Sequence, residues 1–324
     1  MRAILCRELG GSESLELAEI ASPSPGPGEV LVRVKAVGLN FFDTLMLAGK
    51  YQFRPELPFS PGAECAGTVE ALGEGVSGWE VGDRVASFPG YNCCREEIVV
   101  RADRLLKVPD RISDEQAAGL VVTYGTSLHA LKDRARLRHG ETLAVLGAAG
   151  GVGLAAVEIG RAMGARVIAC ASSADKLALA SQHGAEMTLD YTAEDVKEGL
   201  RRLTGGRGAD VIYDPVGGDL AEPALRAIAW QGRYLVVGFA AGPIPKIPLN
   251  LALLKGCDIQ GVFWGSFIER DPAAHRANMA QIFAWTAEGK LSAHVHAVFP
   301  LEQTTQALGV LSRREAKGKV LVKV

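Results

Sequence analysis

Two hydrophobic patterns follow each other along this chain of 324 residues. Up to Pro109, short segments alternate apolar and polar residues, which is the period-two pattern of half-buried strands. The segment EVLVRVKA at residues 29–36 shows this pattern most clearly, and similar segments lie at residues 65–72, 84–87 and 97–100. Because glycine-bearing turns separate these segments, this part of the chain predicts a compact, mostly β domain.

After Pro109, apolar segments of strand length alternate with segments of helical period. The expected strands lie at residues 143–146, 166–170, 187–189, 210–213, 234–237 and 259–263. The expected helices lie at residues 152–163, 174–183, 193–203 and 220–229. This alternation predicts an α/β fold with right-handed βαβ units in a doubly wound parallel sheet. The tail predicts a long helix from residue 273, a strand at 295–299, a short helix and a final strand at 319–324.

The most informative segment is TLAVLGAAGGVGLAAVEIGRAMG at residues 142–164, where an apolar strand runs through a glycine turn into an amphipathic helix. Glycine lets the backbone approach a pyrophosphate closely, and a helix N-terminus offers free amides and a positive dipole end. The first glycine of the G-x-G-x-x-G template is replaced here by Ala148. The predicted dinucleotide cradle consists of Gly150, Gly151, Val152 and Gly153.

The end of the second strand of this sheet indicates which dinucleotide is bound. An NAD site usually has an acidic side chain there, but VIACASSADK places Ser172 and Ser173 at that point, with Lys176 close behind. Small hydroxyls leave room for a 2′-phosphate that the lysine can neutralise, which favours NADP(H). Two alternatives stay open: Ser173 is only a helix cap beside a solvated Lys176, or Asp175 reaches a ribose.

Charge and composition restrict the partners. Thirty-five basic and thirty-seven acidic residues give a formal net charge of −2, too little to recruit nucleic acid or an anionic membrane. Six scattered cysteines indicate reduced thiols, and neither a leader segment nor an apolar run of membrane-spanning length is evident. We therefore expect a cytoplasmic protein with a small-molecule substrate, no membrane, and no nucleic acid as its main partner.

Three stretches carry a resemblance to a known family: GLNFFDTLMLAGKY (residues 38–51), PGAECAGTVEALGEGVSGWEVGDRV (61–85) and AAGGVGLAAVEIGRAMGARVI (148–168). With them the chain resembles the medium-chain dehydrogenase/reductase superfamily, and within it the zinc-independent quinone oxidoreductases related to zeta-crystallin. The resemblance implies a GroES-like catalytic domain at residues 1–119 and 260–324, and a Rossmann domain at residues 120–259.

Departures from the zinc alcohol dehydrogenases of this superfamily indicate that no zinc is bound. Asn40 stands where those relatives have a zinc-binding cysteine, and Ala63 stands where they have a histidine, between Gly62 and Glu64. Catalytic zinc requires about three protein ligands, so these two replacements leave too few. Only Cys93 and Cys94 are adjacent, which does not make a structural zinc site either.

The resemblance also implies roles for residues of the first domain. Asn40 lies near the nicotinamide ribose and the substrate, and Tyr51 matches a tyrosine that relatives place over the nicotinamide. In the similar 2-enoyl thioester reductases, a tyrosine at this location delivers the proton or binds the thioester oxygen. These two are the predicted catalytic residues, and Asn40 also counts as cofactor-binding. The alternative for Tyr51 is a buried aromatic whose hydroxyl is satisfied by the backbone. Lys319 resembles a residue that reaches the nicotinamide-side ribose, although a solvated lysine is the more common explanation.

Further cofactor contacts are implied in the second half of the chain. Thr126 resembles a threonine that contacts the cofactor, and Tyr191 one that packs near the adenosine phosphate. The remaining expected contacts close the fifth strand, at the topological switch, and the sixth strand, near the substrate: Gly238, Phe239, Phe263 and Trp264.

Together these features predict an NADPH-dependent oxidoreductase that transfers hydride to quinones or α,β-unsaturated carbonyls without zinc. An enoyl-thioester (acyl-CoA) reductase is the alternative within enzymes. A crystallin-like structural or RNA-binding protein is the alternative of another class. The resemblance also implies a homodimer, in which the sixth strand is the edge that pairs two sheets.

Overall fold

The computed structural model describes all residues from Met1 to Val324, which form two compact units. Unit 1 consists of Met1–Val122 and Ala293–Val324, and unit 2 consists of Thr123–Ser292. The second boundary therefore lies after Ser292, whereas the sequence placed it after residue 259. Residues 260–292 lie in unit 2 because their long helix bonds to it: Lys132 Nζ donates to Asn278 Oδ1 at 2.9 Å.

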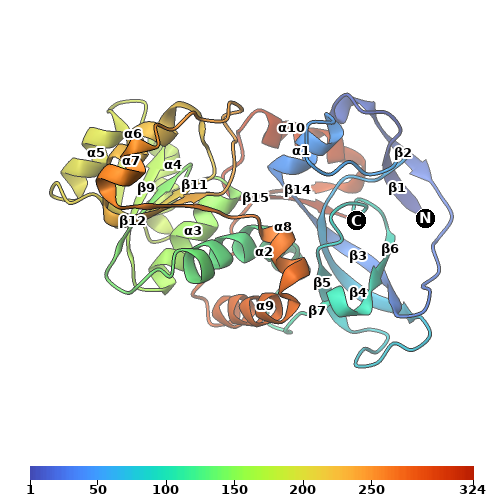
Figure 1. Cartoon of the computed structure of the whole chain (residues 1–324). Helices are drawn as coiled ribbons and strands as arrows, with labels where there is room; N and C mark the ends of the chain where they lie inside the picture. Colours follow the sequence, from blue (N-terminus) through green and yellow to red (C-terminus); the bar gives the residue numbers. More distant parts are fainter. The chain divides into compact units, whose positions relative to one another are not determined.

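Unit 1 is built around a mostly antiparallel sheet, in which only β14 and β15 pair in parallel and the longest strand, β3, lies beside the C-terminal strand β15. The strand order is β14-β15-β3-β4-β5-β7, with β6 also paired to β3, and β15 is antiparallel to β3 (Figure 1). Its strands are β3 (Glu29–Leu39), β4 (Glu64–Leu72), β5 (Arg84–Ser87), β6 (Glu97–Arg101), β7 (Leu106–Lys107), β14 (Val295–Pro300) and β15 (Lys319–Lys323). A separate hairpin-like pair consists of β1 (Arg2–Cys6) and β2 (Leu15–Glu19).

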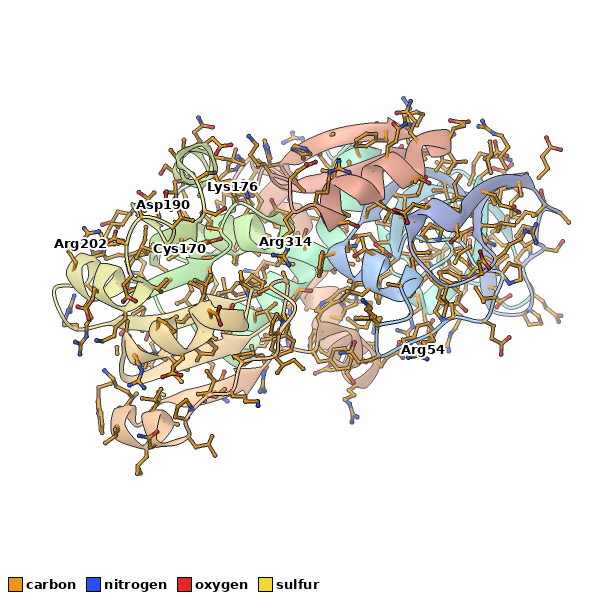
Figure 2. All side chains as sticks on the ribbon, turned by 90° about the horizontal axis from the view of Figure 1, so that it is seen from above. Arg54, Cys170, Lys176, Asp190, Arg202 and Arg314 are labelled. Carbon is orange, nitrogen blue, oxygen red and sulfur yellow. The ribbon has the colours of Figure 1, made fainter.

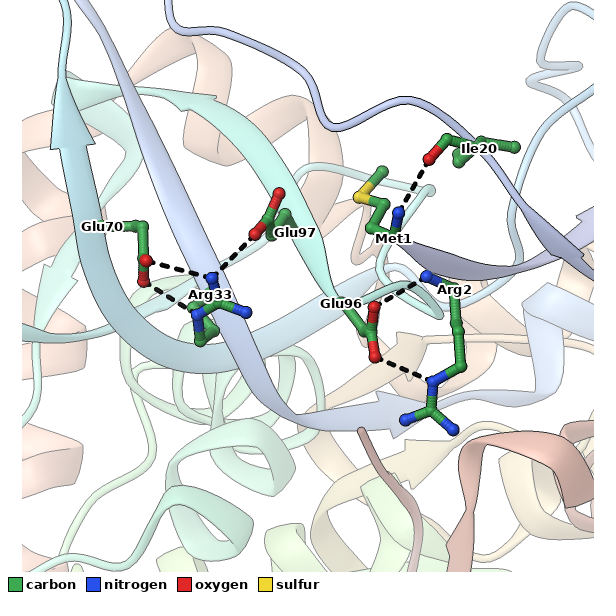
Figure 3. A network of polar contacts seen from close by, with 7 residues as sticks. All are labelled: Met1, Arg2, Ile20, Arg33, Glu70, Glu96 and Glu97. Carbon is green, nitrogen blue, oxygen red and sulfur yellow. Dashed lines mark hydrogen bonds and ion pairs between the residues drawn. The ribbon is translucent and has the colours of Figure 1, made fainter.

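Unit 1 also contains two α-helices, α1 (Phe41–Leu47) and α10 (Thr304–Ser312). Alternate residues of β3, among them Val30, Val32 and Val34, are buried in one hydrophobic core. This confirms the period-two prediction for residues 29–36. At the edge of this core, Arg33 bonds the exposed Glu70 and the buried Glu97, and on the surface Arg2 bonds Glu96 (Figure 3). The exposed pairs of Arg33 with Glu70 and of Arg2 with Glu96 contribute little stability each, so the buried core carries most of the stability of this unit.

Unit 2 contains a six-stranded, wholly parallel sheet in the order β10-β9-β8-β11-β12-β13. This is the 3-2-1-4-5-6 order of a doubly wound nucleotide-binding fold, so the predicted fold class is confirmed. The strands are β8 (Thr142–Leu146), β9 (Arg166–Ala171), β10 (Met187–Asp190), β11 (Ala209–Asp214), β12 (Ile228–Val236) and β13 (Asp258–Gly261). The helices that follow strands are α3 (Gly151–Ala162), α4 (Ala174–Gln182), α5 (Val196–Leu203) and α6 (Ala221–Arg226).

Several elements differ from the sequence prediction. The helix expected at residues 220–229 ends at Arg226, because Ala209 N–H donates to Ala227 O and draws the following residues into β12. Helix α5 begins only at Val196, after Asp195 accepts a capping bond from Glu198 N–H. The helices not foreseen in unit 2 or at its boundary are α2 (Asp114–Leu128), α7 (Asn250–Lys255) and α8 (Trp264–Arg270); the long tail helix is α9 (Pro272–Ala287).

A buried carboxylate in α3 gathers segments of unit 2 that are far apart in sequence. Glu158 accepts hydrogen bonds from Tyr124 Oη at 2.7 Å, from Ser292 N at 3.0 Å, and from His183 Nδ1 at 2.6 Å. Burial raises the pKa of Glu158, but bonds from His183, Ser292 and Tyr124 outweigh it and hold this pKa below its ordinary value. Tyr124 and Ser292 lie next to the two boundaries of unit 2, so Glu158 fixes both ends of this unit.

Candidate cofactor and active site

The glycine turn between β8 and α3 has the geometry that a pyrophosphate requires. Gly150 is the N-cap of α3 and makes no side-chain capping bond. The next three backbone amides, of Gly151, Val152 and Gly153, have no acceptor within the protein. A Cβ at Gly153 would lie 2.2 Å from Gly147 O, so the turn can close only with glycine there. Three free amides at the positive end of a helix fit an anionic phosphate.

Beside this turn, two of the residues predicted to recognise the 2′-phosphate contact each other. Strand β9 ends at Ala171, and Lys176 Nζ donates to Ser172 Oγ at 3.3 Å from the first turn of α4. Ser173 occupies the N-cap of α4 without a side-chain capping bond, and its hydroxyl donates to the Asp175 carboxylate instead. The acid that could have reached a ribose is therefore engaged by a neighbour.

Tyr191 lies at the same edge of the sheet. Its N–H donates to Ala171 O at 3.2 Å, which places it directly beside the end of β9 and the Ser172 position. The preceding Asp190 is the register partner of Ala171 and, with Lys176, is labelled in Figure 2. Its carboxylate accepts bonds from the N–H and hydroxyl of Thr192. The structure thus brings the predicted adenosine-end residues together.

Asp214, which the sequence analysis did not identify, organises the loop that follows β11, at the topological switch point of the parallel sheet. Asp214 ends β11 and accepts N–H bonds from Val216 and Gly217, each at 2.8 Å, and a bond from Tyr234 Oη. Burial raises the pKa of Asp214, although these hydrogen bonds oppose the rise. Its backbone oxygen accepts from Gly238 N–H, which places the predicted Gly238 at the end of β11. The sequence signal that could have located this loop is DPVGG at residues 214–218, which begins with the last residue of β11.

Phe263 and Trp264 were both expected as cofactor contacts at the end of the sixth strand, but in the structure one is exposed and the other is buried. Trp264 is 5% exposed and packs on α2, since a Cβ at Gly125 would lie 2.9 Å from its ring. Thr126, the next residue of α2, is also buried. Phe263 is 62% exposed and is available to a ligand or a partner.

The predicted residues of unit 1 form a buried charged cluster. Glu64 Oε1 accepts bonds from Lys319 Nζ at 2.5 Å and from Asn40 Nδ2 at 2.9 Å. Lys319 Nζ also donates to Asn40 Oδ1 at 2.6 Å, and Asn40 N–H donates to Asp43 Oδ2 at 2.7 Å. The solvated-lysine explanation for Lys319 is therefore wrong, because this side chain is buried and paired. We name Asn40, Asp43, Glu64 and Lys319 the polar cluster.

Asp43 is the titratable member of the polar cluster near neutral pH. Burial raises the pKa of its carboxyl to about 7, and the Glu64 charge adds to the rise. Bonds from backbone amides and the Lys319 charge act in the opposite direction without cancelling it. The cluster therefore changes its charge within the physiological range.

Tyr51 is half-buried and stacks on Phe42, with ring centroids 5.3 Å apart. Its hydroxyl has no hydrogen-bond partner within the protein, unlike a tyrosine that is satisfied by the backbone. Burial raises the pKa of Tyr51, and the Asp43 charge raises it further. The hydroxyl thus stays protonated and is free to donate to a ligand.

The cysteines do not form a metal site. Cys65, Cys93 and Cys94 are buried in the core of unit 1, and burial raises the pKa of the Cys93 and Cys94 thiols. No group of three or more His, Cys, Asp or Glu side chains could hold a metal ion. Nor does any helix have the length and apolar character needed to cross a membrane.

Comparison with known proteins identifies the class of protein to which this chain belongs. Residues 26–110 match the family described as alcohol dehydrogenase GroES-like domain, and residues 151–283 match the one described as zinc-binding dehydrogenase. The first family lies within unit 1 and the second within unit 2, so the chain has the two-domain composition of medium-chain oxidoreductases.

Individual relatives indicate which group within this class the chain is most similar to in sequence and structure. The quinone oxidoreductase-like protein 2 homolog of Nematostella vectensis is 39% identical, over 99% of this chain and 88% of its own length. The crystal structure of Escherichia coli quinone oxidoreductase complexed with NADPH superposes with a TM-score of 0.93, at 29% identity and full coverage of both chains. An NAD-dependent alcohol dehydrogenase superposes with a TM-score of 0.91, at 33% identity, again over the whole of both chains.

The chain belongs to the medium-chain dehydrogenase/reductase superfamily, in its quinone oxidoreductase group, and is an oxidoreductase of that type. The family resemblance noted in the sequence is thereby confirmed.

Replacing Asp43 by Asn should flatten the pH dependence of stability. The raised pKa means that the folded state loses stability as the pH rises from about 4, near the pKa of unfolded Asp, through about 7. The introduced amide cannot ionise, but its oxygen can still accept the Asn40 N–H. The fall in the free energy of unfolding between pH 4 and pH 8 should shrink by on the order of 3 kcal/mol. Urea titrations of both proteins measure this, and an identical fall in both would contradict the assignment.

Proposed function

We propose that this protein is an NADPH-dependent reductase that transfers hydride to quinones or α,β-unsaturated carbonyls without a metal ion. The observation that carries the proposal is the anion cradle of unit 2, formed by the free amides of Gly151, Val152 and Gly153 beside the Ser172–Lys176 pair. The E. coli relative that was solved with NADPH supports the same choice of cofactor.

The cofactor residues form two groups, one for each negatively charged part of the cofactor. The glycine turn faces the pyrophosphate, and Ser172 with Lys176 faces the 2′-phosphate. Because Asp175 is engaged by Ser173, no free carboxylate at this point repels that phosphate. NADH is the alternative, and it would require Asp175 to leave Ser173 and bind a ribose hydroxyl.

Bound NADPH supplies the hydride, and the chain must supply a proton and orientation. Tyr51 is the proposed proton donor, since its hydroxyl is protonated and has no partner within the protein. Conjugated acceptors need no Lewis acid, because conjugation stabilises the anion that hydride addition forms. This agrees with the Asn40 and Ala63 replacements, which remove the metal ligands of zinc relatives.

An enoyl-thioester reductase uses the same hydride and proton and remains the second candidate. Recognition of a phosphate-bearing carrier would require basic residues near Tyr51, and the exposed Arg54, labelled in Figure 2, is one such residue. Turnover of crotonyl-CoA compared with benzoquinone separates the two candidates. A structural or RNA-binding role would be favoured only by a failure of NADPH to bind in a fluorescence titration; the net charge of −2 argues against RNA.

We also propose a homodimer through strand β13. This strand is an edge of the parallel sheet, and Gln260 Oε1 on it is buried without a hydrogen-bond partner. Helix α7, which precedes it, exposes Leu253 by 80% and Leu254 by 66%. A second copy paired along β13 would cover both features. A cytoplasmic location stays a prediction from the sequence.

Replacing Lys176 by Glu should raise the Michaelis constant for NADPH by at least about tenfold, from lost pairing and new repulsion of the 2′-phosphate. The constant for NADH should change far less, because NADH lacks that phosphate. Lys197→Glu is the matched control, since Lys197 pairs only with Glu198 on α5. An unchanged NADPH constant in the Lys176 variant would remove this residue from the site.

Replacing Tyr51 by Phe should lower kcat about 100-fold, the usual contribution of a positioned general acid, while NADPH affinity stays constant. Tyr91→Phe is the control, because Tyr91 is also half-buried and packed against a phenylalanine of unit 1. Steady-state turnover and NADPH fluorescence titration provide the two readouts. Equal kcat values for the Tyr51 and Tyr91 variants would exclude Tyr51 as the donor.

Replacing Leu253 and Leu254 together by Glu should convert a dimer into a monomer in sedimentation velocity, because buried carboxylates would oppose association. Val81→Glu, at a site 67% exposed in unit 1, should leave the dimer intact. A wild-type protein that sediments as a monomer would overturn the proposed assembly.

A further inference from the structure

Unit 2 has a second concave site, at the end of its parallel sheet opposite the glycine turn. Glu141 immediately precedes β8, Asp210 lies near the start of β11, and Asp258 is the first residue of β13. These three residues line a cavity of about 580 Å³, a size that is usual for small-molecule sites. Because the glycine turn follows the other end of β8, a ligand in this cavity does not occupy the dinucleotide cradle.

Most carboxylates around the cavity are engaged by the protein itself. Glu141 accepts bonds from Arg233 through both of its oxygens, at 3.1 and 2.5 Å. Asp210 accepts a backbone N–H at 2.7 Å, and Asp133 accepts bonds from two side chains. Only Asp258 is weakly held, by one side-chain amide at 3.4 Å. Little free negative charge therefore opposes an anion in this cavity.

The arginines around the cavity keep most of their donors. Arg134, Arg136 and Arg138 are exposed and line the cavity. Ala135 and Leu137 between them are buried, so the three arginines lie on one side of this segment. Arg134 uses only its Nε, on a backbone oxygen of β13 at 3.1 Å. The guanidinium groups of Arg136 and Arg138 have no hydrogen-bond acceptor within the protein.

An exposed indole belongs to the same cavity. The pairing of β12 with β11 skips residues 229–232, which extrudes Trp230 from the sheet and leaves it 69% exposed. A Cβ at Gly256 would lie 3.3 Å from the ring, so one edge of the indole packs on the end of α7. Trp230 has no aromatic partner and no acceptor for its Nε1–H within the protein. Its open face is available to a planar ring.

Two residues of the cavity have backbone conformations that side chains rarely adopt. The φ angle is 50° at Arg136 and 58° at Gln231. Such strain persists only where surrounding contacts impose it, and it is common at binding sites. At Arg136 the contacts come from both neighbours: Ala135 O accepts from Arg233 Nε at 3.0 Å, and Leu137 N–H donates to a backbone oxygen at 2.8 Å. The fold thus holds the unpaired guanidinium of Arg136 at the cavity.

We propose that this cavity binds a small aromatic phosphate, which is a planar ring that carries a phosphate group. The ring stacks on Trp230, and the phosphate accepts charge-assisted hydrogen bonds from Arg136 and the two neighbouring arginines. A phosphate matches three guanidinium groups, whereas the two oxygens of a carboxylate would leave more of these donors unused. The site is separate from the proposed reductase site and does not depend on the reductase function.

The probe for this site is naphthyl phosphate, and inorganic phosphate is the control that carries the charge without the ring. Isothermal titration calorimetry on the full chain without cofactor gives both dissociation constants. Wild type should bind naphthyl phosphate about fivefold more tightly than inorganic phosphate, the contribution of one aromatic pair.

Two variants separate the ring from the charge. Trp230→Ala should weaken naphthyl phosphate about fivefold and leave inorganic phosphate unchanged. Arg136→Gln should weaken naphthyl phosphate at least about tenfold, through the loss of a hydrogen bond from a charged group. Arg201→Gln is the matched control, because Arg201 is an exposed arginine of α5 that lies outside the cavity and has no ion pair. All three sites are exposed, so the Tm should not change.

Equal affinity for naphthyl phosphate in wild type, Trp230→Ala and Arg136→Gln would overturn the site. Binding that is lost in Lys176→Glu and kept in Arg136→Gln would also overturn it, because the probe would then occupy the dinucleotide cradle. So would an absence of binding by wild type, and a Trp230→Ala protein that then sediments as a smaller species would identify a second copy as the occupant. A failure to bind NADPH would refute the proposed reductase function and leave these outcomes unchanged.

Discussion

The ion pair between Lys319 and Glu64 is the contact on which the rest of unit 1 depends. It joins the C-terminal strand β15 to β4 across 255 positions of sequence, and both partners are buried. A lone buried charge at either position would cost several kcal/mol, so the pair requires β15 and β4 to be correctly placed on the two sides of β3. Asn40 and the start of α1 are held by the same pair.

Unit 2 is organised by a different constraint. The backbone amides at the start of α3 must stay without protein partners, while the amides of the neighbouring loop are hydrogen-bonded. The glycine turn keeps three amides of α3 free, and Asp214 satisfies the amides of the neighbouring switch-point loop. Glu158, buried in the same helix, ties α3 to Tyr124 and Ser292 at the two ends of the unit. Helix α3 therefore joins the glycine turn to both ends of the unit.

The parts that the sequence predicted well are those whose signal is local. The glycine turn, its strand and its helix are contiguous, so spacing alone located Gly150 to Gly153, and alternation located β3 to β6. Helix α2 was missed because it is buried on nearly all sides and has no polar face to mark its period. The burial of Lys319 and the Glu158 network depend on residues far apart in the chain, which no periodicity encodes. The division near residue 292 was missed for the same reason, since contacts of α9 decide it.

The central claim is that hydride passes to a conjugated acceptor at a site that uses protein donors in place of a metal. The most direct measurement is NADPH oxidation with benzoquinone by protein that has been dialysed against a strong chelator, with its metal content determined in parallel. The account predicts an undiminished rate at a metal content far below one ion per chain. A rate that is lost on chelation and restored by added zinc would contradict it.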